Sequence, residues 1–325
     1  MTTPSTVLVT GATGMLGSHI VDGLVRSGAQ VVAVDLGRPE PGYAWESPEQ
    51  SVRYVPGDVT DRELMDELIA QTDAVVHVAA VLSKAQGDPP GPIFRVNVAG
   101  THGIFESAAR HGRKVVFASS GSVYGPNRPA IDGAPAPAFV EEDPSHQLGF
   151  YALSKQINEL HAEAFGRIEG LRWVAMRCGA MFGSRLRMGL TTRWLLSISD
   201  DVDAGRVPQV DADPDGGLDW ITVEDAGECF VRAVTQEVPD GPINVSTGTA
   251  TRLEDACLAL LRALGAPETI EWTGPRQPSG RFSSARYYSS EKSGRLLGFR
   301  PSADISVGME SFVNWRRAQK ARKGA

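Results

Sequence analysis

The sequence predicts an α/β protein built on a doubly wound parallel sheet, with a smaller α+β region towards its C-terminal end. Two features of the first half support this prediction. Short apolar runs alternate there with amphipathic stretches, and a glycine-rich turn separates the first run from a helical pattern. In such a sheet the carboxyl ends of the strands meet at one edge, which is where ligands bind.

Five apolar runs in the first half have the length and composition of buried strands, and they lie at residues 7–9, 31–34, 52–55, 74–78 and 115–118. Amphipathic stretches, such as the one at 61–70, separate them. A helix is expected over 150–168 and a further strand over 173–176. The segment 125–144 is dense in Pro, Gly, Ala and Asp, which predicts a long surface loop at the mouth of the site.

The turn between the first strand and the first helix has the glycine spacing of a dinucleotide site in a Rossmann-type fold. Its first glycine permits a tight turn, its second lets a pyrophosphate approach the backbone, and its third packs the helix on the strand. The free N–H groups at the helix start would meet the phosphate charge. The predicted cofactor-binding residues of this turn are Gly11, Thr13, Gly14, Met15, Leu16 and Gly17.

Asp35 ends the second predicted strand, roughly 20 residues past the glycines. Its carboxylate can accept hydrogen bonds from an adenosine ribose diol, and it would repel the 2′-phosphate of NADP. Leu36 follows in place of the arginine that such a phosphate would need, although Arg38 is close. The sequence therefore favours NAD as the cofactor; the alternative is that Asp35 simply ends a strand.

The pattern becomes irregular after residue 176, with turns rich in Arg, Gly and Asp between shorter elements. Helices are expected over 222–236 and 253–264, and a strand over 243–245. We expect residues 1–177 to form the NAD-binding domain, which also carries the catalytic residues. Residues 178–325 would form mainly a substrate-binding region, with elements around 218–246 returning to the main domain.

Tyr151 and Lys155 are one helical turn apart and therefore share a face of the predicted helix. A phenol is a poor base near neutral pH, but a neighbouring ammonium group favours the phenolate. Lys155 would supply that charge and could also hold the nicotinamide ribose, while the Ser120 hydroxyl would steady the substrate oxygen. We predict Ser120, Tyr151 and Lys155 as catalytic residues, and the last two as cofactor contacts as well.

The composition argues against several other classes of protein. A net charge of −7 offers no electrostatic surface for nucleic acid, and no apolar run approaches the roughly 18 residues of a membrane helix. Because strand-like sequence begins by Val7, there is no room for a signal peptide, and we expect a cytoplasmic protein. The three cysteines lack the spacing of a disulfide framework or a zinc site, so no metal is expected.

Together these motifs resemble those of the extended short-chain dehydrogenases/reductases, and in particular the NAD-dependent epimerase/dehydratase family with its UDP-sugar 4-epimerases. The resemblance covers nearly the whole chain. Its motifs are T-G-x-x-G-x-x-G at 10–17, G-D-[VIL]-x-D at 57–61, H-x-A-A at 77–80, N-V-x-G-T at 97–101, S-S-x-x-V-Y-G at 119–125, a variant of R-D-[YF]-[IV]-H-V-x-D ending at 225, and N-[VI]-x-[ST]-G at 244–248.

The resemblance implies a second group of cofactor-binding residues. A pair after the third strand would contact adenine, a small pair after the fourth would line the cofactor channel, an asparagine would contact either the cofactor or backbone groups, and a cysteine would pack beside the nicotinamide. In that order they are Asp58, Val59, Ala79, Ala80, Asn97 and Cys178. The family also builds a homodimer on the helices near 101–110 and 151–165, so a homodimer is expected.

Four positions depart from the pattern of the nucleotide-sugar enzymes. Gly121 and Ser122 stand where 4,6-dehydratases carry an Asp-Glu pair, which argues against that reaction. Ala180 and Leu218 stand where epimerases carry the asparagine and arginine that hold the diphosphate. Arginines at 185, 187, 193 or 281 could replace those anchors. The predicted substrate-binding residues are Ser122, Ala180, Arg185 and Arg187.

Three functional hypotheses remain from the sequence. The first is an epimerase that removes and returns hydride at a secondary alcohol of a sugar or nucleotide-sugar, with NAD retained. The second is a net dehydrogenase or ketoreductase for a small polyol, sugar acid or hydroxylated metabolite, which the absent diphosphate anchors favour. The third is a non-catalytic NAD-sensing protein, which the presence of both Tyr151 and Lys155 disfavours.

Overall fold

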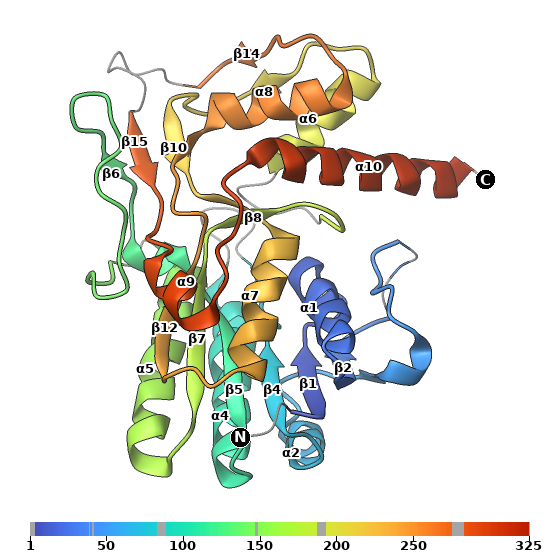
Figure 1. Cartoon of the computed structure of the whole chain (residues 1–325), viewed down its shortest axis with the longest axis vertical. Helices are drawn as coiled ribbons and strands as arrows, with labels where there is room; N and C mark the ends of the chain where they lie inside the picture. Colours follow the sequence, from blue (N-terminus) through green and yellow to red (C-terminus); the bar gives the residue numbers. More distant parts are fainter. Residues whose placement is uncertain are drawn as a thin grey trace.

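The computed structural model describes residues 4–38, 40, 42–82, 89–146, 149–186, 193–274 and 283–324. At its centre lies a seven-stranded, entirely parallel sheet with the strand order β12-β7-β5-β4-β1-β2-β3 (Figure 1). Its strands are β1 (Thr6–Thr10), β2 (Gln30–Asp35), β3 (Val52–Pro56), β4 (Ala74–His77), β5 (Lys114–Ser120), β7 (Trp173–Cys178) and β12 (Gly241–Val245). The predicted doubly wound α/β fold is confirmed.

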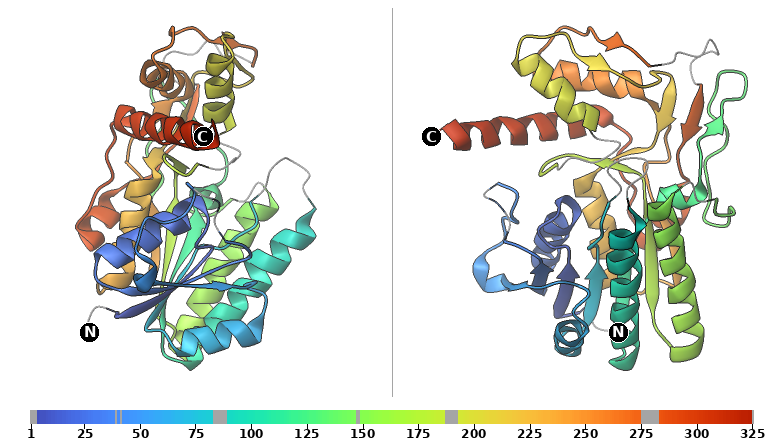
Figure 2. Two further views of the ribbon diagram at one scale, coloured as in Figure 1. Left: turned by 90° about the vertical axis from the view of Figure 1, so that its right-hand side faces the viewer. Right: turned by 180° about the vertical axis from the view of Figure 1, so that it is seen from behind.

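Helices cover both faces of this sheet (Figure 2). One face packs against α1 and α7 in a first hydrophobic cluster, and the other packs against α2, α4 and α5 in a second. The strands are apolar on both sides because each face is buried under helices. These helices are α1 (Met15–Arg26), α2 (Arg62–Ala70), α4 (Thr101–Arg110), α5 (Phe150–Glu169) and α7 (Val223–Thr235).

Several short elements connect the main ones. Asp61 begins α2 as its N-cap, where its carboxylate accepts the N–H of Leu64 at 3.1 Å. Before α4, the chain winds through a short helix and a wider π-helical segment. The connecting elements are η1 (Glu49–Ser51), α3 (Pro90–Ile93), the π-helical η2 (Phe94–Gly100) and η3 (Gly121–Tyr124).

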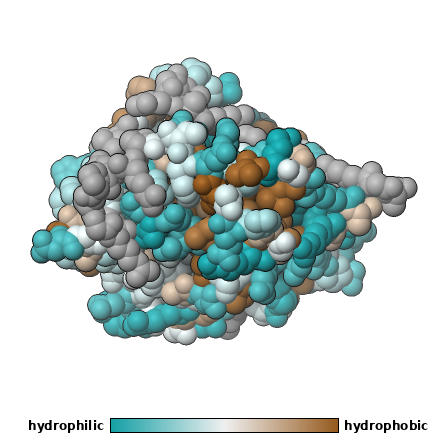
Figure 3. Space-filling view, turned by 90° about the horizontal axis from the view of Figure 1, so that it is seen from above, coloured by the Kyte–Doolittle hydropathy of each residue, from teal (hydrophilic) through white to brown (hydrophobic). Residues whose placement is uncertain are grey.

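The C-terminal elements form a smaller α+β region above the carboxyl edge of the main sheet (Figure 1). A third hydrophobic cluster holds its helices α6 (Arg193–Asp203), α8 (Leu253–Leu264) and α10 (Ile305–Gly324) together. The helix α9 (Glu291–Leu297) packs instead beside α7 on the main sheet. Figure 3 looks down on this end of the molecule, where apolar side chains gather near the middle of the face and hydrophilic ones surround them.

Small sheets complete the C-terminal region. The largest has the order β13-β10-β15-β6, and two further pairs are β8 with β11 and β9 with β14. The strand β6 comes from the segment 125–144, so this predicted loop contributes a strand of its own. The strands are β6 (Arg128–Pro129), β8 (Ala180–Phe182), β9 (Gln209–Val210), β10 (Gly216–Leu218), β11 (Trp220–Thr222), β13 (Thr251–Arg252), β14 (Glu271–Trp272) and β15 (Ser284–Arg286).

The helix α10 reaches back to the segment that follows β2 (Figure 1). The indole N–H of Trp315 donates to the carbonyl of Gly42 at 3.0 Å, and its ring meets Tyr43 edge-on at 5.3 Å. The same segment is tied to α1, because Asp22 accepts the N–H groups of Glu46 and Ser47, each at 2.8 Å. The C-terminal region and the nucleotide-binding half are therefore linked directly. The boundary proposed at residue 177 remains a prediction.

Candidate active site

Two glycines of the segment between β1 and the first turn of α1 have no room for a side chain. Gly11 adopts a φ of +69°, which favours glycine, and a Cβ there would lie 2.6 Å from the backbone nitrogen of Ala79. A Cβ on Gly17 would lie 2.0 Å from the carbonyl oxygen of Gly11. Gly14 is the N-cap of α1 and brings no side chain to the first N–H groups of the helix. The backbone donors at this helix start are thus available to a phosphate.

Asp35 lies at the carboxyl end of β2, beside the glycine turn. Its carboxylate accepts the N–H of Thr13 at 3.0 Å and that of Leu36 at 2.8 Å. The contact with Thr13 fixes the carboxylate relative to the phosphate-binding turn. A dinucleotide whose pyrophosphate lies on that turn would place its adenosine ribose near Asp35.

The other predicted cofactor residues also follow the carboxyl ends of strands. Asp58 follows β3, and its carboxylate accepts the N–H of Thr60 at 2.9 Å. Val59 is buried against Gly100. Ala79 and Ala80 follow β4, and the backbone of Ala79 passes close to Gly11 in the phosphate-binding turn.

Asn97 is fully engaged by the protein itself. Its side-chain oxygen accepts the N–H of Val81 at 2.7 Å, and its nitrogen donates to the Val81 carbonyl at 3.0 Å and to the Ser154 hydroxyl at 3.2 Å. These contacts support the structural alternative for Asn97. It fastens the segment after β4 to α5.

Ser120, Tyr151 and Lys155 come together at the same edge of the sheet. Ser120 ends β5, and its hydroxyl forms a hydrogen bond with the phenol of Tyr151 in the first turn of α5. The Lys155 ammonium lies 5.5 Å from the centroid of the Tyr151 ring and donates to the carbonyl of Ala118 at 2.7 Å. The predicted helix therefore brings both groups to the end of β5.

Burial controls the ionisation of this cluster. It raises the pKa of Tyr151, and the hydrogen bond from Ser120 opposes this shift. It lowers the pKa of Lys155 to about 8, so the ammonium form still predominates at neutral pH. Cys178 lies opposite Ser120 in the β5–β7 register, and burial raises its pKa to about 12. The thiol is thus a neutral packing group.

A buried ion pair joins the catalytic helix α5 to the neighbouring strand β7. Arg177 on β7 donates to Glu159 on α5 at 2.7 Å and to the Tyr124 hydroxyl at 2.9 Å. Ser119, the neighbour of Ser120, also donates to Glu159. Neither Arg177 nor Glu159 is among the residues predicted from the sequence. The only local signal is that Glu159 follows Lys155 by one helical turn, on the same face of α5.

The four predicted substrate residues have different surroundings. The hydroxyl of Ser122 donates to that of Ser120 at 3.0 Å, so Ser122 does lie in the cluster. Ala180 lies on β8, where its N–H donates to the carbonyl of Asp219 at 2.8 Å. Arg185 is buried and forms an ion pair with Asp22 at 2.8 Å. The carboxylate of Asp22 neutralises the positive charge that would otherwise attract a phosphate. Arg187 lies outside the described residues.

Two side chains on and after β15 reach the catalytic segment, and neither is among the residues predicted from the sequence. A Cβ on Gly121 would lie only 2.1 Å from Cζ of Tyr288, so the Tyr288 ring fills the space beside this glycine. Arg286 forms a hydrogen bond with the Tyr288 phenol and donates to the Gly125 carbonyl at 3.1 Å. No local motif indicates these contacts, because more than 150 residues separate the two segments.

Asp219 holds this second group in place. Its carboxylate accepts the N–H of Thr247 at 2.8 Å and that of Tyr288 at 3.3 Å. Burial raises its pKa to about 6, and hydrogen bonds from Thr247, Tyr288 and Gly248 oppose the shift. The turn after β10, the segment after β12 and the segment after β15 therefore meet at one buried carboxylate.

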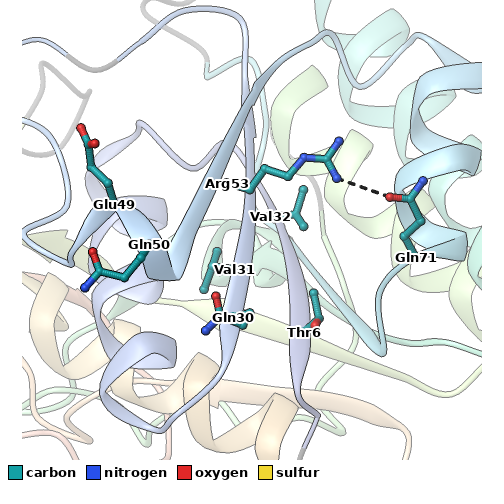
Figure 4. A pocket seen from close by; sticks show the side chains of 8 residues that line it. All are labelled: Thr6, Gln30, Val31, Val32, Glu49, Gln50, Arg53 and Gln71. Atoms are coloured by element: carbon teal, nitrogen blue, oxygen red, sulfur yellow. Dashed lines mark hydrogen bonds between the residues drawn. The ribbon is translucent and has the colours of Figure 1, made fainter.

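A separate pocket lies at the opposite edge of the main sheet. Figure 4 shows its side chains around the amino ends of β1 and β2, where Arg53 donates to Gln71 at 3.4 Å. Its lining residues are Thr6, Gln30, Val31, Val32, Glu49, Gln50, Arg53 and Gln71. Ligands of parallel α/β sheets bind at the carboxyl edge, so this pocket is not the candidate active site.

In the described part of the chain, no helix has both the length and the apolar character needed to cross a membrane.

Comparison with known proteins agrees with this geometry. The model of the NAD dependent epimerase/dehydratase family matches residues 7–246. A UDP-glucose 4-epimerase of Mycolicibacterium smegmatis is 30% identical over 317 residues, covering 95% of this chain and 98% of that protein. A dTDP-glucose 4,6-dehydratase of Streptomyces antibioticus is 30% identical over 328 residues, covering 97% and 93%. The crystal structure of a Thermus thermophilus UDP-glucose 4-epimerase in complex with NAD matches with a TM-score of 0.80 and 26% identity, over 96% of this chain and 99% of that one.

Proposed function

The chain belongs to the NAD dependent epimerase/dehydratase family, and we propose that Ser120, Tyr151 and Lys155 carry out reversible proton transfer during hydride transfer at a secondary alcohol of a sugar or nucleotide-sugar. The protein is an NAD-dependent enzyme similar to nucleotide-sugar 4-epimerases and 4,6-dehydratases. The observation that carries the proposal is the meeting of these three side chains at the carboxyl edge of the sheet that also holds the glycine turn.

The residues present fit a bound NAD. The backbone N–H groups at the start of α1 would hold the pyrophosphate, and the carboxylate of Asp35 would accept the ribose hydroxyls. When bound, NAD supplies the carbon that accepts and returns hydride. Lys155 would hold the nicotinamide ribose with donors that its bond to Ala118 leaves available.

Tyr151 acts as the acid and base in this proposal. Its phenolate form removes the proton of the substrate hydroxyl and becomes the phenol, and the Ser120 hydroxyl holds the same substrate oxygen. Because burial raises the pKa of Tyr151, the phenol is protonated in the free protein at neutral pH, and it must release this proton to solvent before it can act as the base. The Lys155 ammonium, 5.5 Å from the centroid of the Tyr151 ring, would stabilise the phenolate through its positive charge. The same phenol returns the proton when hydride comes back.

Epimerisation fits the residues better than dehydration does. A 4,6-dehydratase must eliminate water, which requires an acid and a base besides the tyrosine. Gly121 has no side chain, and Ser122 donates its hydroxyl to Ser120. The segment after the catalytic serine therefore lacks a carboxylate for the elimination, and epimerisation needs none.

A net dehydrogenase is the second candidate, and two substitutions favour it. Ala180 and Leu218 replace the polar residues that would hold a diphosphate, and the ion pair with Asp22 engages Arg185. A smaller sugar acid or polyol would not need those anchors. The two candidates use the same catalytic residues and differ in whether the reduced cofactor leaves.

We also propose a homodimer built on α4 and α5. Three large apolar side chains of α5 are exposed, namely Phe150, Leu160 and Ile168. A second copy packed on this face would bury them. Light scattering should give twice the mass of one chain, and a monomer would contradict the proposal. Localisation in the cytoplasm remains a prediction.

The deciding experiment follows the cofactor and the sugar together. Purified protein is incubated with NAD and UDP-glucose, and NMR detects UDP-galactose while nicotinamide absorbance reports NADH. Formation of the epimer without accumulation of NADH supports the epimerase, and stoichiometric NADH with an oxidised product supports the dehydrogenase. If a panel of nucleotide-sugars, free sugars and sugar acids gives neither signal while NAD binds, the proposed catalytic role is wrong.

A further inference from the structure

Arg286 differs from the other arginines near the site because it lacks an acidic partner among the residues that the structure describes. Arg177 pairs with Glu159, and Arg185 pairs with Asp22. Among the described residues, the Arg286 guanidinium forms hydrogen bonds with the Tyr288 phenol and the Gly125 carbonyl, and its Nε is enclosed without an acceptor. A half-buried guanidinium is costly to leave uncompensated, so this position favours the arrival of an anion.

Arg286 lies where its positive charge would be close to a bound substrate. The parallel register of β10 and β15 pairs it with Leu218, the position at which a diphosphate-binding arginine is missing. Its contacts, however, lie along the segment that begins at the catalytic serine. The Tyr288 hydroxyl is beside Gly121, the residue after Ser120, and Gly125 follows the end of η3.

The phenol of Tyr288 is buried beside the Arg286 guanidinium, and it lies near the catalytic phenol of Tyr151. The Tyr288 hydroxyl lies beside Gly121, 2.2 Å from where a Cβ on this residue would be. The preceding residue, Ser120, is hydrogen-bonded to the Tyr151 phenol. Burial is the main cause of the shift to about 12 for Tyr288, so its hydroxyl stays protonated and can donate. A guanidinium and a phenol together are suited to a carboxylate, which accepts hydrogen bonds from several donors at once.

We propose that Arg286 and Tyr288 bind a carboxylate that the substrate carries near its reacting alcohol. The preferred substrate is then a sugar acid, free or linked to a nucleotide. This inference rests on the proposed function and makes its substrate more specific. The two residues would select the substrate and take no part in proton or hydride transfer.

The test compares ligands that differ only in the carboxylate. Calorimetry on the NAD-saturated protein measures UDP-glucuronate, UDP-glucose and UDP, and the same comparison is made with free glucuronate and glucose. In the wild type, the acid should bind more tightly than the neutral sugar in at least one of the two series. Arg286→Gln should lower that affinity ratio about 10- to 100-fold, as expected for loss of a charge-assisted contact. Tyr288→Phe should lower it about 3- to 10-fold.

Arg252→Gln is the matched control. Arg252 lies on β13, the other neighbour of β10, and pairs with Asp215 at 2.6 Å. Its loss should lower the melting temperature and leave the affinity ratio unchanged. Arg286→Lys keeps the charge without the planar fork, so it should lower the ratio less than Arg286→Gln does.

The outcomes separate the inference from the function on which it rests. An equal loss of affinity for UDP-glucuronate, UDP-glucose and UDP would assign Arg286 to the diphosphate and overturn the inference. An unchanged ratio in folded Arg286→Gln would overturn it as well. In both cases turnover by the wild type, and its loss in Tyr151→Phe, would leave the proposed function standing. If no substrate is turned over by the wild type, the function fails independently of the ratio.

Discussion

Replacing Gly121 by alanine would place a methyl group inside the volume that Tyr288 fills. The new Cβ would lie 2.1 Å from Cζ and 2.2 Å from the hydroxyl oxygen of Tyr288. Carbon atoms in contact lie about 3.5–4.0 Å apart, so the ring would have to retreat by roughly 1.4 Å or more. It has little room, because it stacks on Tyr124 at 5.5 Å and its backbone is bonded to Asp219.

The size of the effect follows from this geometry. Overpacking of a core costs about 1–3 kcal/mol, and a displacement above 1 Å shared with a second ring belongs to the upper part, about 2–3 kcal/mol. At roughly 2.1 cal/mol/K per residue, the unfolding entropy of a chain of 325 residues is about 0.7 kcal/mol/K, so each kcal/mol lowers the melting temperature by roughly 1.5 °C. We therefore expect Gly121→Ala to lower it by roughly 3–5 °C.

A mutant cycle tests the cause of this loss. The free energy of unfolding is measured by chemical denaturation for Gly121→Ala in the wild type, in Tyr288→Phe and in Tyr288→Leu. Phenylalanine keeps Cζ in place, so the cost should persist, whereas leucine removes the clashing atoms, so the cost should largely disappear. An equal cost in the leucine background, or no cost in the wild type, would refute the assignment of Tyr288 to this space.

Three further predictions concern the cofactor, the catalytic base and the pH dependence of stability. Tyr151→Phe should abolish turnover while the affinity for NAD, measured by calorimetry, stays within a few fold; a wild-type rate would remove Tyr151 from catalysis. Asp35→Ser should weaken NAD binding about 10- to 100-fold through loss of charged hydrogen bonds to the ribose, and unchanged affinity in the same titration would exclude that contact. Burial raises the pKa of Asp219 from the ordinary value of 3.8 to about 6 in the folded protein. The folded state therefore holds this proton more tightly than the unfolded state does, which stabilises the fold at low pH. This contribution to the free energy of unfolding is lost as the pH rises through 6. The stability difference between the wild type and Asp219→Asn should therefore be about 1 kcal/mol more favourable to the wild type at pH 5 than at pH 7, and a difference that does not vary with pH would contradict the raised pKa.

The features that the sequence predicted correctly depend on contacts that are close along the chain. The spacing of Gly11 and Gly17 reflects one turn of the backbone against itself, since a Cβ at residue 17 would meet the carbonyl of residue 11. Tyr151 and Lys155 share a face because a helix repeats every 3.6 residues. The apolar runs became parallel strands because helices bury both faces of the sheet.

The features that the sequence analysis lacked depend on contacts across long stretches of the chain. The ion pair of Arg185 with Asp22 joins the segment after β8 to α1, and nothing near either residue indicates it. Arg286 reaches the site because β15 pairs with β10 in a sheet whose strands are only two or three residues long. Strands that short have no detectable alternation of apolar and polar residues. Their pairing could be known only from the folded chain.

The contact between Trp315 and Gly42 has a practical meaning for the nucleotide half of the molecule. The segment that follows Asp35 is held by contacts with α10, the last helix that the structure describes. A fragment cut before that helix would keep the phosphate-binding turn and lose these contacts. We expect such a fragment to release the adenosine end of its cofactor faster than the whole protein does, so studies of NAD exchange require the intact chain.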